Sequence, residues 1–396
     1  MRALRITIAA LLLVAAAVFA AWASAPDPRF NPASFEDEPL DPGIAPVDVA
    51  ITLAQFRGED GTMHTLVVTG FDDESVTGID LAALGGTSSD DPFAALATAD
   101  LDPLRAGNTA ALPQVSVAMT DLLPTGTSGD RHIGTGTNFP EHAEEANSGS
   151  VFQFPKFGPA RPARTVVKAD PGILLDYEVE LCMRFDRDIA SAEDFDAAQK
   201  GVFLCGDFTN RNALVELADP DNLDSGSGFS DSKSGPHSFP TGPFLVIPAD
   251  WNAFVADLRM TTTVNGAPRQ DAHGREMTMD FRALAQKALG DMDRERFLYR
   301  GGYHRLAADG RIDTSMTLMS GTSEGVIFTG PTRADYIEAA LAYLGRGGPL
   351  SGVSLTDTGK RVFIANELAS GHFLQPGDVV RHGSSYLGDI EVRVVE

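Results

Sequence analysis

The sequence has few cysteines and few basic residues. Its 396 residues include two cysteines, Cys182 and Cys205, which are too few for a disulfide scaffold and leave no C-x-x-C or other thiolate metal pattern. Lysine and arginine total 31 against 55 aspartates and glutamates, and the formal net charge is −24. Because so acidic a surface repels phosphate backbones and anionic lipid, we expect no nucleic-acid partner. Any metal ion is held by oxygen or imidazole ligands.

The N-terminus has the form of an export signal. Arg2 and Arg5 precede an apolar run over residues 6–22, and Ala23-Ser24-Ala25 follows as an A-x-A cleavage site. The run is long for a signal peptide and short for a spanning helix, so residues 1–25 are predicted to be a signal peptide or an uncleaved membrane anchor. In either case the remaining chain is expected to be exported, to the periplasm or beyond.

The chain divides by composition after this segment. Residues 26–46 are rich in Pro, Asp and Glu without periodicity, which predicts a disordered tether. Residues 47–70 are typical of a hairpin and open a small N-terminal domain over residues 47–125, which contains strands and shows no catalytic pattern. Residues 126–396 are expected to form a second, larger domain, in which all of the candidate site residues described below lie.

Two glutamates lie two residues apart within an apolar, β-prone run. Residues 175–181 read L-D-Y-E-V-E-L, and strand alternation puts Glu178 and Glu180 on one face. Asp207 ends the next apolar run and supplies a third carboxylate. Neighbouring anions in a half-buried setting repel, so we expect a hard divalent cation between them. The alternative is a solvated strand face whose acids point outward.

A second candidate pair lies on a short helix. Residues 126–136 are rich in Gly, Thr and Ser and are predicted to be a flexible loop that leads into a helix over residues 138–146, with Pro140 in its first turn. His142 and Glu145 stand at i and i+3, within hydrogen-bonding reach. A base oriented by a carboxylate suits general-base catalysis on a mobile lid. The alternative is a surface pair without a role.

Other segments carry weaker signals. A long Ser, Gly and Pro loop over residues 224–242 contains Lys233, and such loops in ordered domains are often functional. The turn at residues 320–325 is rich in hydrogen-bond donors and suits a carboxylate. Helices are predicted over residues 192–200, 277–289 and 332–344, the last capped by Thr332 and Asp335 and with an apolar face of Ile337, Leu341 and Leu344.

The cysteines are related to the candidate metal ligands by position. Cys182 lies two residues after Glu180, and Cys205 lies two residues before Asp207. If the two strands run antiparallel and meet at the metal, the sulfurs are neighbours and can be bridged. If the helix between the strands makes a parallel crossover, the sulfurs are too far apart to bridge.

Taken in order, seven motifs resemble the fumarylacetoacetate hydrolase family. They are N-F-P-E-H-A-E-E, D-Y-E-V-E-L, D-F-T-N-R, Lys233 followed by P-T-G-P-F, N-G-A-P-R-Q, G-T-S-E-G and L-Q-P-G-D-V-V. The resemblance runs from about residue 130 to the C-terminus. It implies a β-rich α+β fold, a mixed β roll with few helices, to which this chain adds the N-terminal domain and an insertion over about residues 328–372.

The resemblance also implies roles for particular residues. Glu178, Glu180 and Asp207 would bind Mg²⁺ or Mn²⁺, with Ca²⁺ as a possible substitute. His142 and Glu145 would activate water, Arg211 and Lys233 would contribute to catalysis, and the substrate would be contacted by Arg211, Lys233, Gly321 and Thr322. Asn212 and Leu214 stand where related hydrolases carry an acid and a glutamine.

The function implied is a metal-dependent hydrolase that cleaves a C–C bond in acylpyruvate or another 1,3-dicarbonyl acid. The alternative is an isomerase, tautomerase or decarboxylase of 2-oxo or 2-hydroxy-dienoic acids that uses the same enolate chemistry, and a further alternative is an idle binding protein for oxo acids. The expected partner is a small oxo acid, the expected assembly is a homodimer, and membrane contact is expected only through an uncleaved N-terminal anchor.

Overall fold

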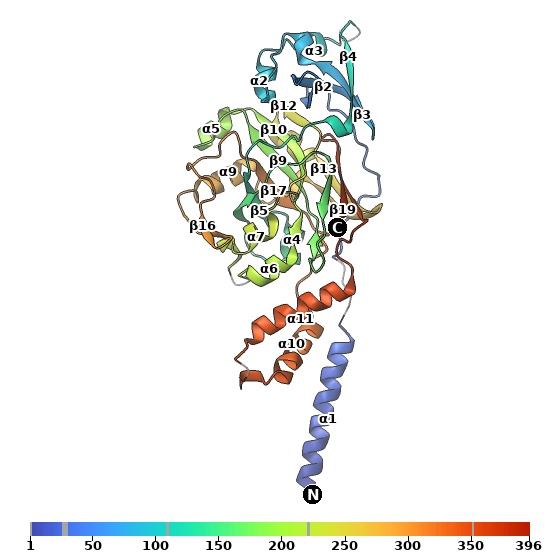
Figure 1. The fold of residues 1–396 in the computed structure, drawn as a ribbon, viewed down its shortest axis with the longest axis vertical. Coiled ribbons are helices and arrows are strands. Elements are labelled where there is room, and N and C mark those ends of the chain that lie inside the picture. The colour runs from blue at the N-terminus through green and yellow to red at the C-terminus, as the bar shows by residue number, and fades with distance from the viewer. Residues whose placement is uncertain (1, 26–30, 108–110, 220–221, 351) are drawn as a thin grey trace.

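A computed structural model describes residues 2–25, 31–107, 111–219, 222–350 and 352–396. A ten-stranded mixed sheet runs through most of the molecule (Figure 1). Its neighbouring strands are antiparallel except for β17 and β5, which are parallel. In spatial order the strands are β4 (Gln114–Ala118), β3 (Ser75–Asp80), β2 (Met63–Phe71), β1 (Ala50–Arg57), β12 (Leu245–Pro248), β10 (Lys200–Gly206), β9 (Val179–Phe185), β17 (Leu318–Thr322), β5 (Arg131–Gly136) and β6 (Phe152–Phe157).

A second sheet of five strands packs against the middle of the first. Its order is β14 (Ala267–His273), β13 (Arg259–Val264), β18 (Val379–Ser384), β19 (Asp389–Val395) and β7 (Arg164–Lys168). Leu181 and Leu204 from the large sheet and Val380 and Val392 from the small one share a single apolar core. Two short pairs complete the strands, β8 (Leu175–Asp176) with β11 (Thr209–Asn210) and β15 (Phe297–Tyr299) with β16 (Gly302–His304).

Helices are mostly short. They are α1 (Arg2–Ala23), α2 (Pro92–Ala97), α3 (Asp102–Arg105), α4 (Pro140–Glu145), α5 (Ala192–Ala197), α6 (Arg211–Leu217), α7 (Phe229–Lys233), α8 (Trp251–Asp257), α9 (Phe281–Leu289), α10 (Arg333–Gly345) and α11 (Leu355–Ser370). Single 3₁₀ turns are η1 (Leu81–Leu84), η2 (Met119–Asp121), η3 (Leu223–Ser225), η4 (Gly274–Glu276) and η5 (Gly348–Leu350). Among the helices of the described residues, only α1, α10 and α11 exceed nine residues, and the predicted β-rich α+β fold is confirmed.

The N-terminal strands continue the sheet that contains β9 and β10. The predicted hairpin is present as β1 and β2, and β1 pairs with β12 from Ala50 opposite Pro248 to Leu53 opposite Leu245. An apolar cluster that includes Leu53 and Phe93 also contains the two cysteines of β9 and β10. The sheet and this cluster therefore join residues 47–125 to the catalytic part of the molecule.

Two predicted loops are ordered. Residues 131–136 form β5 in the interior of the sheet, where Gly134 and Gly136 leave room for the rings of Phe154 and Phe152. The glycines thus mark close packing and not flexibility. Of the predicted tether, residues 26–30 lie outside the described residues, while residues 31–46 lie along the catalytic part, with Asn31 Nδ2 donating to the carbonyl of Val326 at 2.8 Å.

Cys182 and Cys205 form a disulfide. β9 and β10 are antiparallel, with Cys205 opposite Glu180 and Cys182 opposite Phe203, so the two cysteines are diagonal neighbours on one face. Their Cα atoms are 6.0 Å apart. The connecting helix α5 returns the chain in the antiparallel direction, which excludes the crossover alternative. The bridge ties together the two strands that carry the acidic residues.

We expect removal of this bridge to destabilise the protein. It links positions separated by 23 residues, and closing a loop of that length restricts the unfolded chain by about 3 kcal/mol. Urea unfolding of a Cys182→Ala, Cys205→Ala variant should show a loss of that order, and the unmutated protein under reducing conditions should match it. Equal stability of the oxidised and reduced unmutated protein would contradict this expectation.

Candidate active site

Three buried carboxylates meet where β9 begins and β10 ends. Glu178 immediately precedes β9, Glu180 is its second residue, and Asp207 follows β10. The backbone N–H of Asp207 donates to the carbonyl of Glu178 at 2.9 Å, which fixes the two strand ends together. One oxygen from each carboxylate lies within 4.8 Å of the others. The antiparallel pair of β9 and β10 therefore brings together the three acids that sequence analysis predicts as metal ligands.

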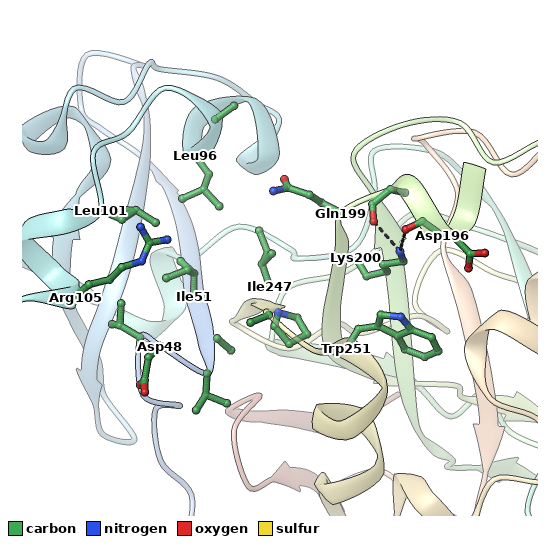
Figure 2. A pocket seen from close by; sticks show the side chains of 17 residues that line it. Asp48, Ile51, Leu96, Leu101, Arg105, Asp196, Gln199, Lys200, Ile247 and Trp251 are labelled. Atoms are coloured by element: carbon green, nitrogen blue, oxygen red, sulfur yellow. Dashed lines mark hydrogen bonds between the residues drawn. The ribbon is translucent and has the colours of Figure 1, made fainter. Parts of the chain in front are cut away.

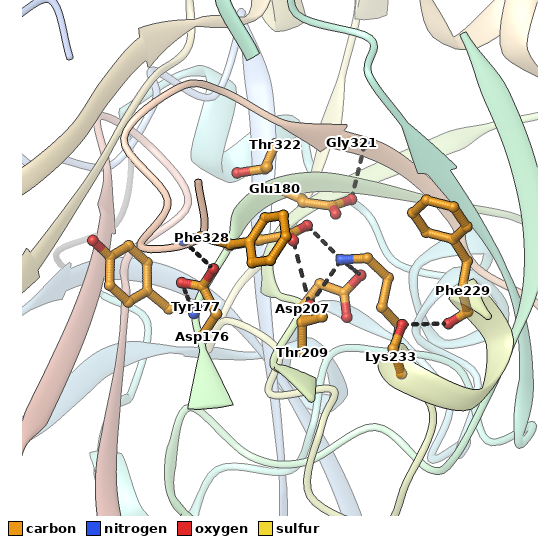
Figure 3. A network of polar contacts seen from close by, with 12 residues as sticks. Asp176, Tyr177, Glu180, Asp207, Thr209, Phe229, Lys233, Gly321, Thr322 and Phe328 are labelled. Carbon is orange, nitrogen blue, oxygen red and sulfur yellow. Dashed lines mark hydrogen bonds and ion pairs between the residues drawn. The ribbon is translucent and has the colours of Figure 1, made fainter. Parts of the chain in front are cut away.

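Two lysines form ion pairs with this group, Lys233 (Figure 3) and Lys156. Lys233 Nζ donates to Glu178 Oε2 at 2.6 Å, to Asp207 Oδ2 at 3.1 Å and to Thr209 Oγ1 at 2.9 Å. Lys156 Nζ, which no solvent reaches, donates to Asp207 Oδ1 at 2.7 Å. Sequence reasoning assigned Lys156 no role, although a lysine among the apolar residues of β6 indicates a buried anionic partner.

Arg211 is held between two acids. Its Nε donates to Asp176 Oδ2 at 2.8 Å and its terminal nitrogen to Glu178 Oε1 at 2.8 Å. The same Asp176 carboxylate accepts the backbone N–H groups of Ile327 and Phe328, each at 3.0 Å. A guanidinium anchored in this way has a fixed orientation at the edge of the acidic group.

The carboxylates differ in how well their charge is compensated. Burial opposes the ionisation of Glu178, but Lys233 and Arg211 outweigh it and hold its pKa below the usual value. Burial, with repulsion from Asp207 and Glu178, instead raises the pKa of Glu180 well above its usual value. Glu180 Oε2 accepts from the backbone N–H of Gly321 at 2.9 Å, whereas Oε1 is buried without a partner.

A divalent cation fits this arrangement. The unpartnered Oε1 of Glu180 faces a buried group of oxygen ligands, which Mg²⁺, Mn²⁺ and Ca²⁺ prefer, and no thiolate or imidazole belongs to the cluster. A cation bound to Glu178, Glu180 and Asp207 would supply the charge that Glu180 otherwise lacks.

His142 and Glu145 form a hydrogen-bonded pair on α4. His142 Nδ1 and Glu145 Oε2 are 2.9 Å apart, and Glu145 Oε1 accepts the backbone N–H of Gly325 at 2.8 Å. The second bond attaches α4 to the segment that follows β17. The predicted helix begins later than residue 138, since Phe139 precedes it and the side chain of Asn138 donates to the carbonyls of Met279 and Ser320.

The pair shares a cavity with Glu178, one carboxylate of the acidic group. Its volume is about 570 Å³, and its wall includes His142, Glu145, Glu178, Arg211, Lys233 and Thr322. The hydroxyl of Thr322 donates to the carbonyl of Val179 at 2.9 Å and accepts from Gln270 Nε2 at 2.9 Å. The backbone N–H of Gly321, the other predicted substrate contact, donates to Glu180 Oε2. The helix α4, which the sequence predicts to be a mobile lid, thus contributes His142 and Glu145 to the wall of the cavity.

A larger hollow of about 830 Å³ lies elsewhere, between the N-terminal strands and β10 (Figure 2). Its Lys200 donates to the carbonyls of Asp196 and Ala198 at 3.1 and 2.7 Å. None of the predicted site residues lines it. The smaller cavity is therefore the candidate active site.

Comparison with known proteins agrees with this framework of a β roll around a buried acidic group. Residues 131–395 match the family model described as fumarylacetoacetate (FAA) hydrolase C-terminal. The chain belongs to the fumarylacetoacetate hydrolase family. Members of this family are enzymes that typically bind a divalent metal ion. Comparison with the curated proteins gave no match.

Solved structures show the same fold. Fumarylacetoacetate hydrolase from Exiguobacterium antarcticum is 17% identical with a TM-score of 0.50, over 87% of this chain and 99% of the other. The 2-hydroxyhepta-2,4-diene-1,7-dioate isomerase from Mycobacterium marinum is 18% identical with a TM-score of 0.50, over 87% of this chain and 98% of the other. The shared architecture therefore includes a hydrolase and an isomerase.

Replacing Glu180 by Gln should abolish tight metal binding. The change removes one anionic ligand, and we expect Mn²⁺ affinity to fall by about 100-fold or more, since even groups behind the ligands contribute 10–100-fold. Because the buried charge of Glu180 is poorly compensated, the metal-free variant should unfold at the same temperature as the unmutated protein or higher. Isothermal titration calorimetry and thermal unfolding measure the two effects.

Glu144→Gln is the matched control, since Glu144 is an exposed acid on α4. It should bind Mn²⁺ like the unmutated protein. Unchanged binding by Glu180→Gln would show that the three acids are not the metal site.

Proposed function

We propose that the chain is a metal-dependent hydrolase that cleaves a C–C bond in acylpyruvates or other 1,3-dicarbonyl acids. The observation that carries this proposal is a histidine oriented by a carboxylate in the same cavity as Glu178, which belongs to the buried carboxylate triad. A binding protein for oxo acids needs no general base. The idle alternative is therefore disfavoured.

The roles of the residues follow from their charges and contacts. His142, oriented by Glu145 through Nδ1, is placed to take a proton at Nε2 from a water molecule that adds to the substrate carbonyl. Burial opposes the charged form of Lys233, but Asp207 and Glu178 outweigh it and raise its pKa. Lys233 thus stays cationic and, with Arg211, offsets negative charge on the substrate oxygens.

The bond changes balance without a further reactant. Water adds to the distal carbonyl carbon, the bond from that carbon to the central carbon breaks, and the electron pair becomes the enolate of the 2-oxo acid. The proton taken by His142 is then delivered to the central carbon of the enolate, which gives a 2-oxo acid and a carboxylic acid. Mg²⁺ or Mn²⁺ on Glu178, Glu180 and Asp207 would act as a Lewis acid toward the substrate oxygens.

An exported location is part of the proposal. The disulfide suits an oxidising compartment, and an apolar helix over Arg5–Ala23 is long enough to be a signal sequence or an anchor. We propose that catalysis takes place in the periplasm or outside the cell.

The reaction type is tested by product analysis. Incubation with acetylpyruvate and Mn²⁺ should release acetate and pyruvate, whereas an isomerase would return only tautomers. Incubation with oxaloacetate should leave the substrate intact, while a decarboxylase would release CO₂. Absence of acetate from acetylpyruvate, together with turnover of oxaloacetate, would favour the decarboxylase alternative.

Replacing His142 by Ala should lower turnover of the best substrate by about 10²-fold or more, because the general base is lost. Mn²⁺ affinity should not change, since His142 belongs to no ligand group. Steady-state kinetics and calorimetry on His142→Ala and on Glu144→Ala from the same helix measure both quantities. Near-normal turnover of the His142 variant would leave the histidine without a catalytic role.

A further inference from the structure

Two long helical segments lie side by side outside the catalytic roll (Figure 1). One is α1, and the other is a hairpin of α10 and α11 over residues 331–371, here called the helical hairpin. Trp22 Nε1 of α1 donates to Glu338 Oε1 of α10 at 2.6 Å, and Asn366 of α11 donates to the other oxygen of Glu338 at 2.6 Å. One carboxylate thus links all three helices.

The apolar face of α10 is uncovered. Sequence periodicity predicts that Leu341 and Leu344 face a core, yet they are 61% and 64% exposed. Leu350 at the turn is 96% exposed, and Leu355 at the start of α11 is 51% exposed. Six of the twelve large hydrophobic side chains that are exposed in the described part of the chain outside α1 belong to this hairpin. Such a concentration marks an interaction surface.

The hairpin differs from the rest of the molecule in its net charge. Residues 331–371 contain four basic and four acidic residues, so the net charge of −24 lies entirely elsewhere. Between Glu338 and Asp357 the only charged residue is Arg346. The acidic surface repels anionic lipid, whereas this neutral tip does not. An apolar tip with one arginine is suited to the interface of a bilayer.

The neighbour of the hairpin is a candidate membrane span. Arg5–Ala23 has a mean hydropathy of 2.5 over its most apolar window and none of that window is buried. At about 1.5 Å per residue its 19 residues extend about 28 Å, close to the hydrocarbon thickness of about 30 Å. Trp22 at its end and Tyr336 and Tyr343 on α10 are the residue types that line membrane interfaces.

The hairpin also forms part of the catalytic cavity. Tyr336 and Lys360 line that cavity together with Phe328 and Pro331 at the root of the hairpin. Lys360 Nζ donates to the carbonyl of Glu216 on α6 at 2.7 Å, which fixes α11 against the roll. A surface that the tip of the hairpin contacts therefore lies about one helix length from the cavity, about 20 Å for the 13 residues of α10.

We propose that the helical hairpin is a membrane-docking element. Its tip, Leu341, Leu344, Leu350 and Leu355, inserts into the interface of a lipid bilayer beside α1, and the catalytic cavity is thereby held at the membrane surface. The packing of α10 against the candidate membrane span α1, and the absence of net charge in the hairpin, favour lipid as the occupant. This inference does not depend on which reaction the cavity catalyses.

The test uses the intact chain in phosphatidylcholine vesicles. Both native cysteines are in the disulfide, so Leu344→Cys and Leu350→Cys variants each carry a single thiol for a nitroxide spin label. Tyr303→Cys is the control, because Tyr303 is 67% exposed on β16 of the roll. All three side chains are exposed, and labelling should not disturb the fold.

We expect collisions with oxygen, which dissolves in lipid, to exceed those with a water-soluble nickel chelate several-fold at positions 344 and 350, and the reverse at 303. Equal, water-like accessibility at all three positions would overturn the proposal. Protection from both reagents at 344 and 350 would instead indicate a protein or second-copy contact and would also overturn it. If the protein is recovered as a chain that begins at residue 26 and this chain does not bind the vesicles, the proposal is likewise overturned.

Discussion

The structure depends on holding three carboxylates within 4.8 Å of one another away from water. Like charges about 4 Å apart repel by about 4 kcal/mol even at an effective dielectric constant of 20, so each acid must be matched by a positive group. β6 supplies Lys156, α6 supplies Arg211 and α7 supplies Lys233. A helix as short as α7 is not stable alone. Ser230 Oγ of α7 donates to the carbonyl of Pro155 at 2.6 Å, so these ion pairs and bonds determine where the short helices lie.

The negative charge of Glu180 is not matched by a basic side chain. Four buried acids, Asp176, Glu178, Glu180 and Asp207, face three basic partners, and Glu180 makes no salt bridge in the described part of the chain. The group is thus one positive charge short. A divalent cation would leave it one positive charge in excess, which suits an anionic substrate. The same imbalance that destabilises the protein without metal would favour a 2-oxo acid once a cation is bound.

Sequence reasoning found the acids because strand alternation and apolar context are local signals. It did not find Lys156, whose partner is 51 residues away and is revealed only by the pairing of strands. It also took residues 131–136 for a flexible loop, since glycine content alone does not distinguish flexibility from close packing under Phe152 and Phe154. Sequence analysis also did not predict the helix α11 or the interior position of Asn138, because both depend on tertiary contacts and leave no periodic pattern in the sequence.

The carboxylate of Asp176 links the helical hairpin to Arg211 and the acidic group. The Asp176 carboxylate accepts hydrogen bonds from Arg211 Nε and from the backbone N–H groups of Ile327 and Phe328. These two residues lead directly into the hairpin. The ring of Phe328 stacks near Arg211, with the guanidinium carbon 5.2 Å from its centroid. Any displacement of the root of the hairpin must therefore alter the support of Arg211 and, through Glu178, of the acidic group. An insertion outside the roll is thus attached to the candidate active site by hydrogen bonds to a buried carboxylate and not by a free linker.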